Sequence, residues 1–468
     1  MRNKIFGAVL MLAVPGVSMG EYAVTISPGE LEGALKEMPQ GEKELKLSGS
    51  AGITDLLVLH DLEGIESLDL TGLKIEGSRL DKGNFYGRTL FYEDELPSYI
   101  FSGTGYKRIV MPSGITAIGE GTFSGSSLES VEIPATVRTI GSYAFSSMKS
   151  LTTVSGGENV ESIGTGVFSN DNLVTDIDLS RMRITSIPER AFSGCVLLTD
   201  VMMPQTVKKV GKYAFAGSGV TSLNVSGVTE IDDYAFSSMP ELETATLSSS
   251  VQQGEGMFLG DARLSDAVGV SADVPAFTFS GCPSIDVNAI LVYAENIGES
   301  AFAGNNALKL VFGKDVKSLG KNVFGGMNGL DTIEVKALGA NVPAVTAETF
   351  TGLDQKNIVL SVNDDDLSVW RNSPYWNEFD VQKYGTGSMS GVKSDGGIVI
   401  TYGDARLVVT SADEIERIDI YGLEGAVYAN LAPRETSATV DMTRYDNSHG
   451  VVVRVVTSRS ERSVKILF

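Results

Sequence analysis

The side chains that most often carry out catalysis are scarce in this 468-residue chain. Its only histidines are His60 and His449, and its only cysteines are Cys195 and Cys282. The two histidines stand near opposite ends of the sequence, so they supply neither a catalytic triad nor a histidine metal site within one domain. Neither cysteine has a histidine near it in sequence, and a cysteine nucleophile with its usual base is therefore not supported.

Acidic residues offer the remaining routes to chemistry. The run Asn363–Asp366 gathers the oxygen ligands that calcium prefers, but it lacks the glycine and the bidentate acid of a calcium loop, and we interpret it as a solvated turn. Two carboxylates suffice for glycoside hydrolysis, yet nothing in the sequence marks a pocket around any two of the 59 acids. The sequence therefore predicts a protein that is not an enzyme and has no cofactor or metal site.

Two pairs of glycines have a spacing that also occurs in ligand-binding loops. Gly119-x-Gly121 and Gly164-x-Gly166 could be taken for phosphate-binding loops. Both pairs fall at the same point of a repeated unit, which indicates the chemistry of a turn. We therefore expect no phosphate ligand there.

The elements that must position all these side chains are copies of one unit. Leu128–Phe145 joins a short strand of alternating apolar residues to a turn and one large anchoring ring. The anchor returns at intervals of 21 to 26 residues, which lies within the range of leucine-rich repeats. Such a register predicts a mainly-β solenoid in which the strands form one parallel sheet and the returns are short and irregular. The anchors are Phe101, Phe123, Phe145, Phe168, Phe192, Phe215, Phe236, Phe258, Phe279, Phe302, Phe324 and Phe350.

The repeated pattern resembles that of a known family. The spacing L-x-x-V-x-I-P-x-x-V-x-x-I-G-x-x-A-F-x-G, seen in Leu128–Phe145 and Leu198–Phe215, is similar to the BspA-like leucine-rich repeats of bacterial surface proteins. The likeness extends to a cap-like segment, Leu45–Ile75, and to a closing segment, Val369–Phe379, and so covers about residues 27 to 384. The resemblance implies adhesion to host or bacterial surface molecules.

The chain is expected to have five parts. Residues 1–20 have the features of a signal peptide, with Arg2 and Lys4 before an apolar run and small residues at Ser18 and Gly20. Residues 21–100 should form an N-terminal cap, and residues 101–384 the repeats with a C-terminal cap. Residues 385–397 are rich in glycine and serine and predict a flexible linker. Residues 398–468 contain β-rich runs that predict a small β-sandwich.

The terminal part, residues 398–468, contains a series of short motifs in a fixed order. They are Ile418-x-Ile420-Tyr421 with Gly425, Val440-Asp441-Met442, Gly450–Val455 and Lys465. In these motifs the chain resembles the C-terminal sorting domains of type IX secretion cargo, although Val452 stands where that family often has tyrosine. The resemblance implies a sorting signal, and a plain β-sandwich is the alternative.

Charge limits the partners. With 37 basic and 59 acidic residues, the formal net charge is −22, which repels nucleic acid and anionic lipid headgroups. No apolar run outside the signal peptide approaches the roughly 18 residues needed to span a bilayer, so no membrane insertion is expected after signal removal. We expect a monomer, secreted or on the outer cell surface, whose partner is a host or bacterial surface protein or glycan.

The cysteines test the repeat register. Cys195 and Cys282 each follow an anchor phenylalanine by three residues, in repeats that are four steps apart. Because neighbouring strands are ~4.8 Å apart, the two sulfurs should be separated by roughly 19 Å, beyond the reach of a disulfide. We predict two free, buried thiols.

The candidate binding face consists of the residues that flank the central aliphatic of each strand. These side chains are predicted to point away from the core, and repeat proteins commonly bind partners with such a face. We expect the four acids of this set to lie close together on strands of consecutive repeats, with a solvated sheet face as the alternative. The candidates are Ser130, Glu132, Thr153, Asp176, Asp178, Asp200, Met202 and Asn224.

The closing segment offers a second kind of surface. Trp370, Tyr375, Trp376 and Phe379 lie close together in sequence. They suit either a cap over the last repeat, which we favour, or an aromatic platform for a sugar. The alternative function is accordingly a glycan-binding accessory protein of polysaccharide use.

Overall fold

The computed structural model describes residues 21–80, 83–335, 342–383, 392–393, 398–403, 406–422, 427–442, 451–459 and 461–466. They form two compact units. The first contains the chain up to Leu308 together with Asp315–Leu330 and Pro343–Leu353. The second contains Lys309–Lys314, Asp331–Val342 and the chain from Asp354 onward. The predicted signal peptide and most of the predicted linker lie outside the described residues, as does His449.

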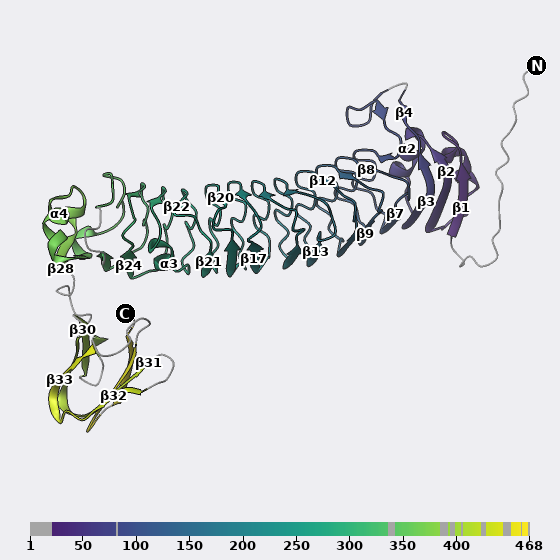
Figure 1. Cartoon of the computed structure of the whole chain (residues 1–468). Helices are drawn as coiled ribbons and strands as arrows, with labels where there is room; N and C mark the ends of the chain where they lie inside the picture. Colours follow the sequence, from purple (N-terminus) through teal and green to yellow (C-terminus); the bar gives the residue numbers. More distant parts are fainter. Residues whose placement is uncertain are drawn as a thin grey trace, which may run out of the picture. The chain divides into compact units, whose positions relative to one another are not determined.

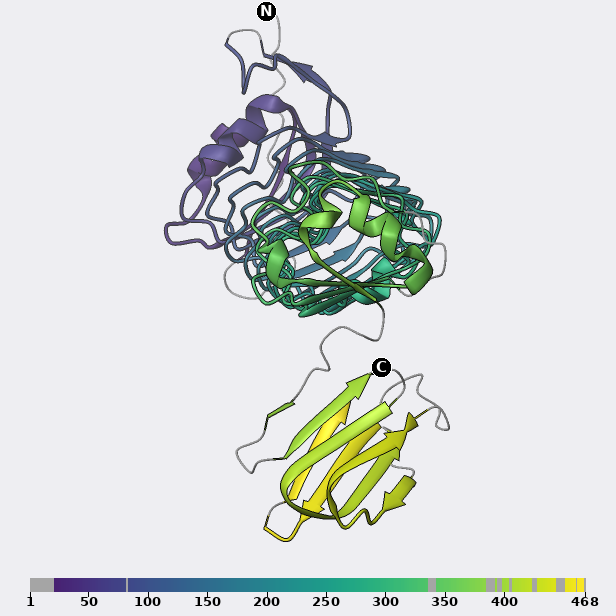
Figure 2. The same cartoon turned by 90° about the vertical axis from the view of Figure 1, so that its left-hand side faces the viewer.

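The first unit begins with a parallel sheet of order β1-β2-β3-β7, which α2 covers (Figure 2). Helix α2 buries Ile53, Leu56 and Leu59. Its buried Asp55 accepts hydrogen bonds from the backbone N–H groups of Gly29 and Leu31, which ties the entry of α1 to α2. The elements are β1 (Glu21–Ile26), α1 (Leu31–Ala34), η1 (Leu35–Glu37), β2 (Glu44–Ala51), α2 (Ile53–Asp61) and β3 (Ser67–Ile75).

The segment between Glu76 and Leu96, where the repeat pattern is lost, contains a short antiparallel pair. Strands β4 (Ser78–Arg79) and β5 (Leu90–Phe91) pair with each other, and Figure 1 shows β4 set apart from the row of coils. The described residues of this segment therefore form a short antiparallel pair that does not belong to the repeats.

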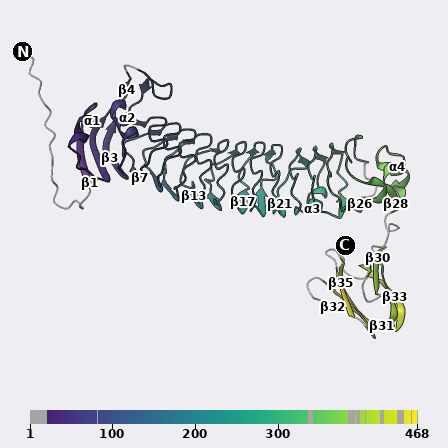
Figure 3. The same ribbon diagram turned by 180° about the vertical axis from the view of Figure 1, so that it is seen from behind.

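Most repeats contribute two strands, one long and one short, which lie along opposite sides of the solenoid (Figures 1 and 3). The parallel solenoid and its long strands were predicted, whereas the two-residue strands within the returns were not. The long strands are β7 (Arg108–Val110), β9 (Ser130–Ile133), β11 (Thr153–Gly156), β13 (Asp176–Asp178), β15 (Asp200–Met202), β17 (Ser222–Val225), β19 (Thr244–Leu247) and β21 (Asp266–Val268). The short strands are β6 (Glu95–Leu96), β8 (Ala117–Ile118), β10 (Thr139–Ile140), β12 (Ser162–Ile163), β14 (Ser186–Ile187), β16 (Lys209–Val210), β18 (Glu230–Ile231), β20 (Gln252–Gln253), β22 (Asp273–Val274), β23 (Asn296–Ile297) and β25 (Ser318–Leu319).

The long strands do not form the single sheet that the sequence predicts. Beyond β7 they are hydrogen-bonded as β9–β11, as β13–β15 and as β17–β19–β21. In the repeat that follows β21, helix α3 (Val287–Leu291) stands at the place of a long strand. Asp286 accepts hydrogen bonds from the backbone N–H groups of Asn288 and Ala289, and an aspartate cap of this kind favours a helix start over continued strand.

The core of the repeats contains a row of stacked phenylalanine rings, as predicted. All twelve anchors are buried. From Phe101 to Phe324, the ring centroids of successive anchors lie 5.1 to 6.3 Å apart, and most pairs are stacked. Each such side chain contributes about 1.5–3 kcal/mol through burial. Cys195 and Cys282 are buried and free, which confirms that prediction too.

The turn before each anchor explains the glycine pairs. Gly121 and Gly166 have φ values of +58° and +61°, in the left-handed region that favours glycine. Gly119 serves a different purpose, because a Cβ there would lie 2.6 Å from the backbone nitrogen of Ser98 in the preceding repeat. The interpretation of these glycines as turn residues is confirmed.

The second unit contains two sheets. Strands β24, β26, β27 and β28 form a parallel sheet, with Trp370 of α4 and Trp376 buried. In the other, β31 pairs with β30 and β33 through its first half and with β32 and β34 through its second, around an aliphatic core. This part is β-rich, and its description as a small β-sandwich stays a prediction. The elements are β24 (Lys309–Phe312), β26 (Thr332–Val335), η2 (Gln355–Asn357), β27 (Val359–Val362), η3 (Asp364–Asp366), α4 (Leu367–Asn372), η4 (Trp376–Glu378), β28 (Asp380–Lys383), β29 (Val392–Lys393), β30 (Val399–Gly403), β31 (Arg406–Gly422), β32 (Val427–Leu431), β33 (Glu435–Asp441), β34 (Val451–Thr457) and β35 (Glu461–Ile466).

Candidate functional site

All eight candidate residues lie on long strands of the first unit and are exposed. The residues between them, such as Val131, Ile177 and Leu223, are buried. Alternation along a strand sends successive side chains to opposite faces, so the core holds the aliphatics and the polar residues face outward. We call the exposed side of β9 to β21 the long-strand face.

Strands β13 and β15 bring two aspartates together. Asp176 lies directly beside Asp200, and Asp178 beside Met202, in a parallel pair. Neighbouring strands are ~4.8 Å apart, so the side chains of Asp176 and Asp200 emerge next to each other. Between exposed carboxylates this close, the repulsion is on the order of 1 kcal/mol, which a positively charged group on a partner would relieve.

The fourth predicted acid, Glu132, does not belong to this cluster. It lies on β9 beside Ser155 of β11, and β9–β11 is a separate two-stranded sheet from β13–β15. The expectation that all four acids fall on consecutive repeats was wrong, because the repeat of Thr153 intervenes. We therefore define the acidic cluster as Asp176, Asp178 and Asp200.

Within the part of the chain that the structure describes, the acids of the cluster, Asp176, Asp178 and Asp200, form no ion pairs. Arg181 nevertheless lies near enough to Asp178 to help Ser180 lower the pKa of its carboxyl. Several acids of the opposite, short-strand side of the solenoid are paired: Lys209 contacts Glu230 and Asp232, Lys317 contacts Glu295, and Lys321 contacts Glu348. The acidic cluster is thus a local patch of carboxylates without ion pairs on the long-strand face.

The side chains of two candidate residues accept hydrogen bonds from backbone N–H groups two residues further along the chain. Asp178 Oδ1 accepts a hydrogen bond of 2.8 Å from the backbone N–H of Ser180, and this interaction with Ser180 lowers the pKa of the Asp178 carboxyl. Asn224 Oδ1 likewise accepts from the backbone N–H and the hydroxyl of Ser226. Both side chains therefore close a turn at the end of their strands, which leaves Asp176 and Asp200 as the freer pair.

A recess opens where β15 and β17 fail to pair. Its volume is about 190 Å³, and Asp200 and Asn224 of the predicted site line it together with Ser222. Buried Phe215 and Val220 contribute apolar lining. Since small-molecule sites usually measure about 300–1,000 Å³, this recess suits one side chain of a macromolecular partner.

The other candidates for chemistry have structural partners. Nδ1 of His60 lies 3.0 Å from the carbonyl oxygen of Ile100. Asp364, in the acidic run, forms an ion pair with Lys383. Among the described residues, no group of three or more histidines, cysteines, aspartates or glutamates is placed to hold a metal ion.

The closing aromatic segment does not present a platform. Trp370 and Trp376 are each only 1% exposed, and their rings meet edge to face. Trp376 also packs against Phe312 of β24. Their ring faces are therefore unavailable to a sugar, and the sugar-platform interpretation of this segment is not supported.

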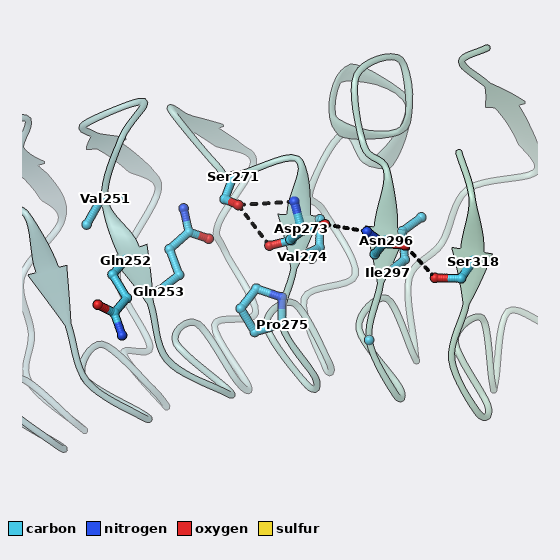
Figure 4. A pocket seen from close by; sticks show the side chains of 11 residues that line it. Val251, Gln252, Gln253, Ser271, Asp273, Val274, Pro275, Asn296, Ile297 and Ser318 are labelled. Atoms are coloured by element: carbon cyan, nitrogen blue, oxygen red, sulfur yellow. Dashed lines mark hydrogen bonds between the residues drawn. The ribbon is translucent and has the colours of Figure 1, made fainter. Parts of the chain in front are cut away.

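The opposite side of the solenoid has a larger groove, which the sequence did not predict. It measures about 470 Å³ and lies between β20 and β22 (Figure 4). Gln252, Gln253, Asp273 and Asn296 line it. The two-residue strands that carry these side chains are too short to show a periodic signal, although Pro275 marks the place in the sequence.

No helix among the described residues has the length and apolar character needed to cross a membrane. A comparison with curated proteins found no match. Among solved structures, the chain is similar to a leucine-rich repeat protein from Bacteroides ovatus, with 21% identity, a TM-score of 0.52, and coverage of 77% of this chain and 86% of that one. This similarity supports the solenoid fold.

Two further solved structures match with lower TM-scores. A leucine rich cell surface protein from Faecalibacterium prausnitzii is 17% identical, with a TM-score of 0.32 and coverage of 58% of this chain and 82% of that one. The pneumococcal vaccine antigen PcpA is 14% identical, with a TM-score of 0.34 and coverage of 76% and 82%.

Family models give the most direct assignment. The model described as the BspA type leucine rich repeat region matches residues 94–221, 174–271 and 270–368, more than half of the chain in total. The recurring anchors and the parallel solenoid agree with this match. The chain belongs to the BspA type leucine-rich repeat family.

Proposed function

We propose that this protein is a non-catalytic surface protein that binds a basic segment of a host or bacterial surface protein through its long-strand face. The observation that carries the proposal is the acidic cluster of Asp176, Asp178 and Asp200, none of which forms an ion pair among the described residues, whereas several acids on the short-strand side do. An uncompensated patch of one sign attracts a partner of the other and accelerates its encounter.

The recess beside the cluster supports a protein partner. It holds about 190 Å³, and its lining combines the carboxylate of Asp200 with the apolar side chains of Phe215 and Val220. A lysine or arginine side chain matches such a lining, because its stem is apolar and its tip is cationic. The chain belongs to the BspA type family, whose repeats occur in bacterial surface proteins. This membership supports a secreted or cell-surface location.

The test compares two charge-matched variants for binding to a panel of purified extracellular-matrix proteins. The triple variant Asp176→Asn, Asp178→Asn, Asp200→Asn removes the cluster. The control replaces exposed acids elsewhere, Glu161→Gln, Glu255→Gln and Glu299→Gln, and makes the same change in net charge.

We expect the parent and the control to bind the same basic matrix proteins, and the cluster variant to bind at least tenfold more weakly at low salt. Physiological salt should narrow that difference, since exposed charges are screened over about 8 Å. Equal affinities of parent and cluster variant at both salt concentrations would remove the long-strand face from consideration.

We also propose that residues 398–468 act as a type IX sorting signal. Support comes from the motif residues, because Ile418 and Ile420 are buried and pair in register with Val455 and Val453. In a bacterium with type IX secretion, the full chain should reach the surface and a chain that ends at Lys383 should remain in the periplasm. Surface display of the shortened chain would contradict the sorting role.

A further inference from the structure

The groove on the short-strand side exists because the ladder of short strands is broken there. Strands β14, β16, β18 and β20 form one sheet, and β22, β23 and β25 form the next. Both sheets are parallel and advance by one strand per repeat. The groove of about 470 Å³ occupies the gap between β20 and β22 (Figure 4).

A proline explains the break. In unbroken repeats, the residue after the short strand is usually a glycine whose N–H donates to the preceding repeat, as Gly254 does to Ile231, Gly298 to Val274 and Gly320 to Ile297 at 2.7–2.8 Å. Residue 275 occupies this place after β22 and is a proline, which has no N–H to donate.

The ring of Pro275 also takes up space. At the glycines of this position the preceding backbone is so close that a Cβ on Gly254 or Gly298 would lie 2.4 Å from it. A proline therefore excludes close approach at this one position as well as removing the hydrogen bond, while the next residue stays bonded, with the Gly256 N–H donating to the Ala276 carbonyl at 2.8 Å. The same residue type, Pro188, follows β14 at the break between β12 and β14, so each of the two breaks has a proline at this place.

The two walls of the gap differ. On the β22 wall, the hydroxyl of Ser271 accepts from the backbone N–H of Asp273 and donates to its backbone carbonyl, which seals that strand edge. On the β20 wall, the carbonyl of Gln253 faces the position where a donor would come from residue 275. The side-chain Oε1 of Gln253 is buried without a hydrogen-bond partner among the described residues.

A polar ladder continues from the groove along the next strands. Asn296 Nδ2 donates to Asp273 Oδ1 at 2.6 Å, and the Ser318 hydroxyl donates to Asn296 Oδ1 at 2.7 Å (Figure 4). These bonds fix the planes of the Asp273 carboxylate and the Asn296 amide. Preorganised planar groups of this kind lose little entropy when they bind a ligand.

The lining restricts the ligand. No lysine or arginine lines the groove, and Asp273 would repel an anion. The edge of β22 is sealed and β20 is only two residues long, so a peptide strand would not find the row of ladder bonds that strand addition requires. Six of the lining residues carry amide, hydroxyl or carboxylate groups, while most of the exposed surface of the groove is apolar, so a ligand that fits must offer both hydrogen-bonding groups and an apolar face.

What fits is a ligand that is rich in hydroxyl groups, uncharged and of modest size. Sugar hydroxyls both donate and accept, and the groove offers an acceptor at Asp273 together with amide groups at Gln252 and Asn296. The volume lies within the usual range of about 300–1,000 Å³ for small-ligand sites. We propose that the groove between β20 and β22 is a second binding site, which takes a neutral sugar unit of a glycan.

The experiment measures binding of the full chain to immobilised neutral oligosaccharides, namely glucan, mannan, galactan and N-acetylhexosamine series, with uronate oligosaccharides as the acidic comparison. Asp273→Ala removes the central acceptor. Pro275→Gly restores the missing N–H and removes the ring, so it should draw β20 and β22 together and close the groove. Pro188→Gly makes the same change at the other break and is the matched control.

We expect the parent to bind at least one neutral series and no uronate. Binding should fall at least tenfold in Asp273→Ala and Pro275→Gly and stay within twofold of the parent in Pro188→Gly and in the cluster variant of the long-strand face. Far-UV circular dichroism checks that each variant is folded, and should Pro275→Gly not fold, Asn296→Ala takes its place. Absence of binding to every neutral series, preference for uronates, or unchanged binding in Asp273→Ala would overturn the proposal.

Discussion

Two aspartates inside the solenoid should make its stability depend on pH. Asp171 and Asp261 each lie three residues after an anchor and are fully buried. Oδ1 of each accepts a hydrogen bond of 2.7 Å from a backbone N–H of the preceding repeat, at Met148 and Met239. Oδ2 of each is buried without a hydrogen-bond partner among the described residues.

Burial disfavours the charged form of both groups. It raises the pKa of Asp171 and that of Asp261 to about 9, against the hydrogen bond from the preceding repeat, which lowers them. The next repeat places a buried thiol beside each carboxyl, Cys195 and Cys282, whose own pKa burial raises in turn. At neutral pH the folded state therefore holds both aspartates protonated.

The sign of the effect follows from proton binding. An unfolded aspartate has a pKa of about 3.9, so between about pH 4 and pH 9 the folded chain retains a proton that the unfolded chain has lost. The stabilisation is complete below the unfolded pKa and is lost as the pH rises through the folded pKa. Each aspartate should thus lower the free energy of unfolding by about 1.4 kcal/mol per pH unit, or about 2.7 kcal/mol between pH 5 and pH 7.

The perturbation is Asp171→Asn, alone and combined with Asp261→Asn. Asparagine keeps Oδ1 and cannot titrate, and the chain already uses it at this place: Asn305 donates to the carbonyls of Cys282 and Ile285 in the preceding repeat. Urea unfolding followed by far-UV circular dichroism at pH 5, 6, 7 and 8 gives the free energies. Asp266→Asn, at an exposed position on β21, is the control.

We expect each buried replacement to reduce the slope of the free energy of unfolding against pH by about 1.4 kcal/mol per pH unit. The stability of the variant relative to the parent should therefore increase as the pH rises. The control should follow the parent. Parallel curves for the parent and the Asp171→Asn, Asp261→Asn variant would refute the reasoning, because the two carboxyls would then be ionised inside the folded solenoid.

Three further outcomes follow from packing. Phe215→Ala should destabilise the repeats by about 3–5 kcal/mol through the cavity it leaves, and a melting temperature within a degree or two of the parent would contradict this. Cys195 and Cys282 should react with a thiol reagent only after unfolding, without reductant, and an intact mass lower by two hydrogens would disprove the free thiols. Gly141→Ala should lower the melting temperature, since its Cβ would lie 2.5 Å from a backbone nitrogen of the preceding repeat, whereas Gly227→Ala, with open space around it, should not.

The parts of the fold that depend on repetition were predictable. The anchor register identified the twelve phenylalanines that are repeated through the core, though not buried Tyr106 or Phe312, and alternation along the long strands identified which of their residues are exposed. Both signals are summed over many copies, so a local deviation in one repeat does not erase them. The free cysteines followed from the same register.

The parts that depend on one repeat differing from its neighbours were not predictable from periodicity. Asp286 starts α3 where a strand was expected, and the gap between β11 and β13 separates Glu132 from the acidic cluster. The first feature depends on hydrogen bonds to the Asp286 side chain in a single repeat, and a pattern averaged over many repeats reports on neither feature. We have no physical account of the gap between β11 and β13.

The groove shows which sequence signal reports on hydrogen bonds between successive repeats. At Gly254 and Gly298 the backbone N–H donates a hydrogen bond to the preceding repeat, and the absence of a Cβ lets the two backbones approach closely. A proline at such a position removes the hydrogen bond and also adds a ring where there is no room for one. Pro188 and Pro275 are the substitutions of this type at which the short-strand sheets end and restart. In a solenoid, therefore, the residue that breaks the repeat consensus locates a gap between coils, and the polar side chains around that gap are the first place to look for a ligand.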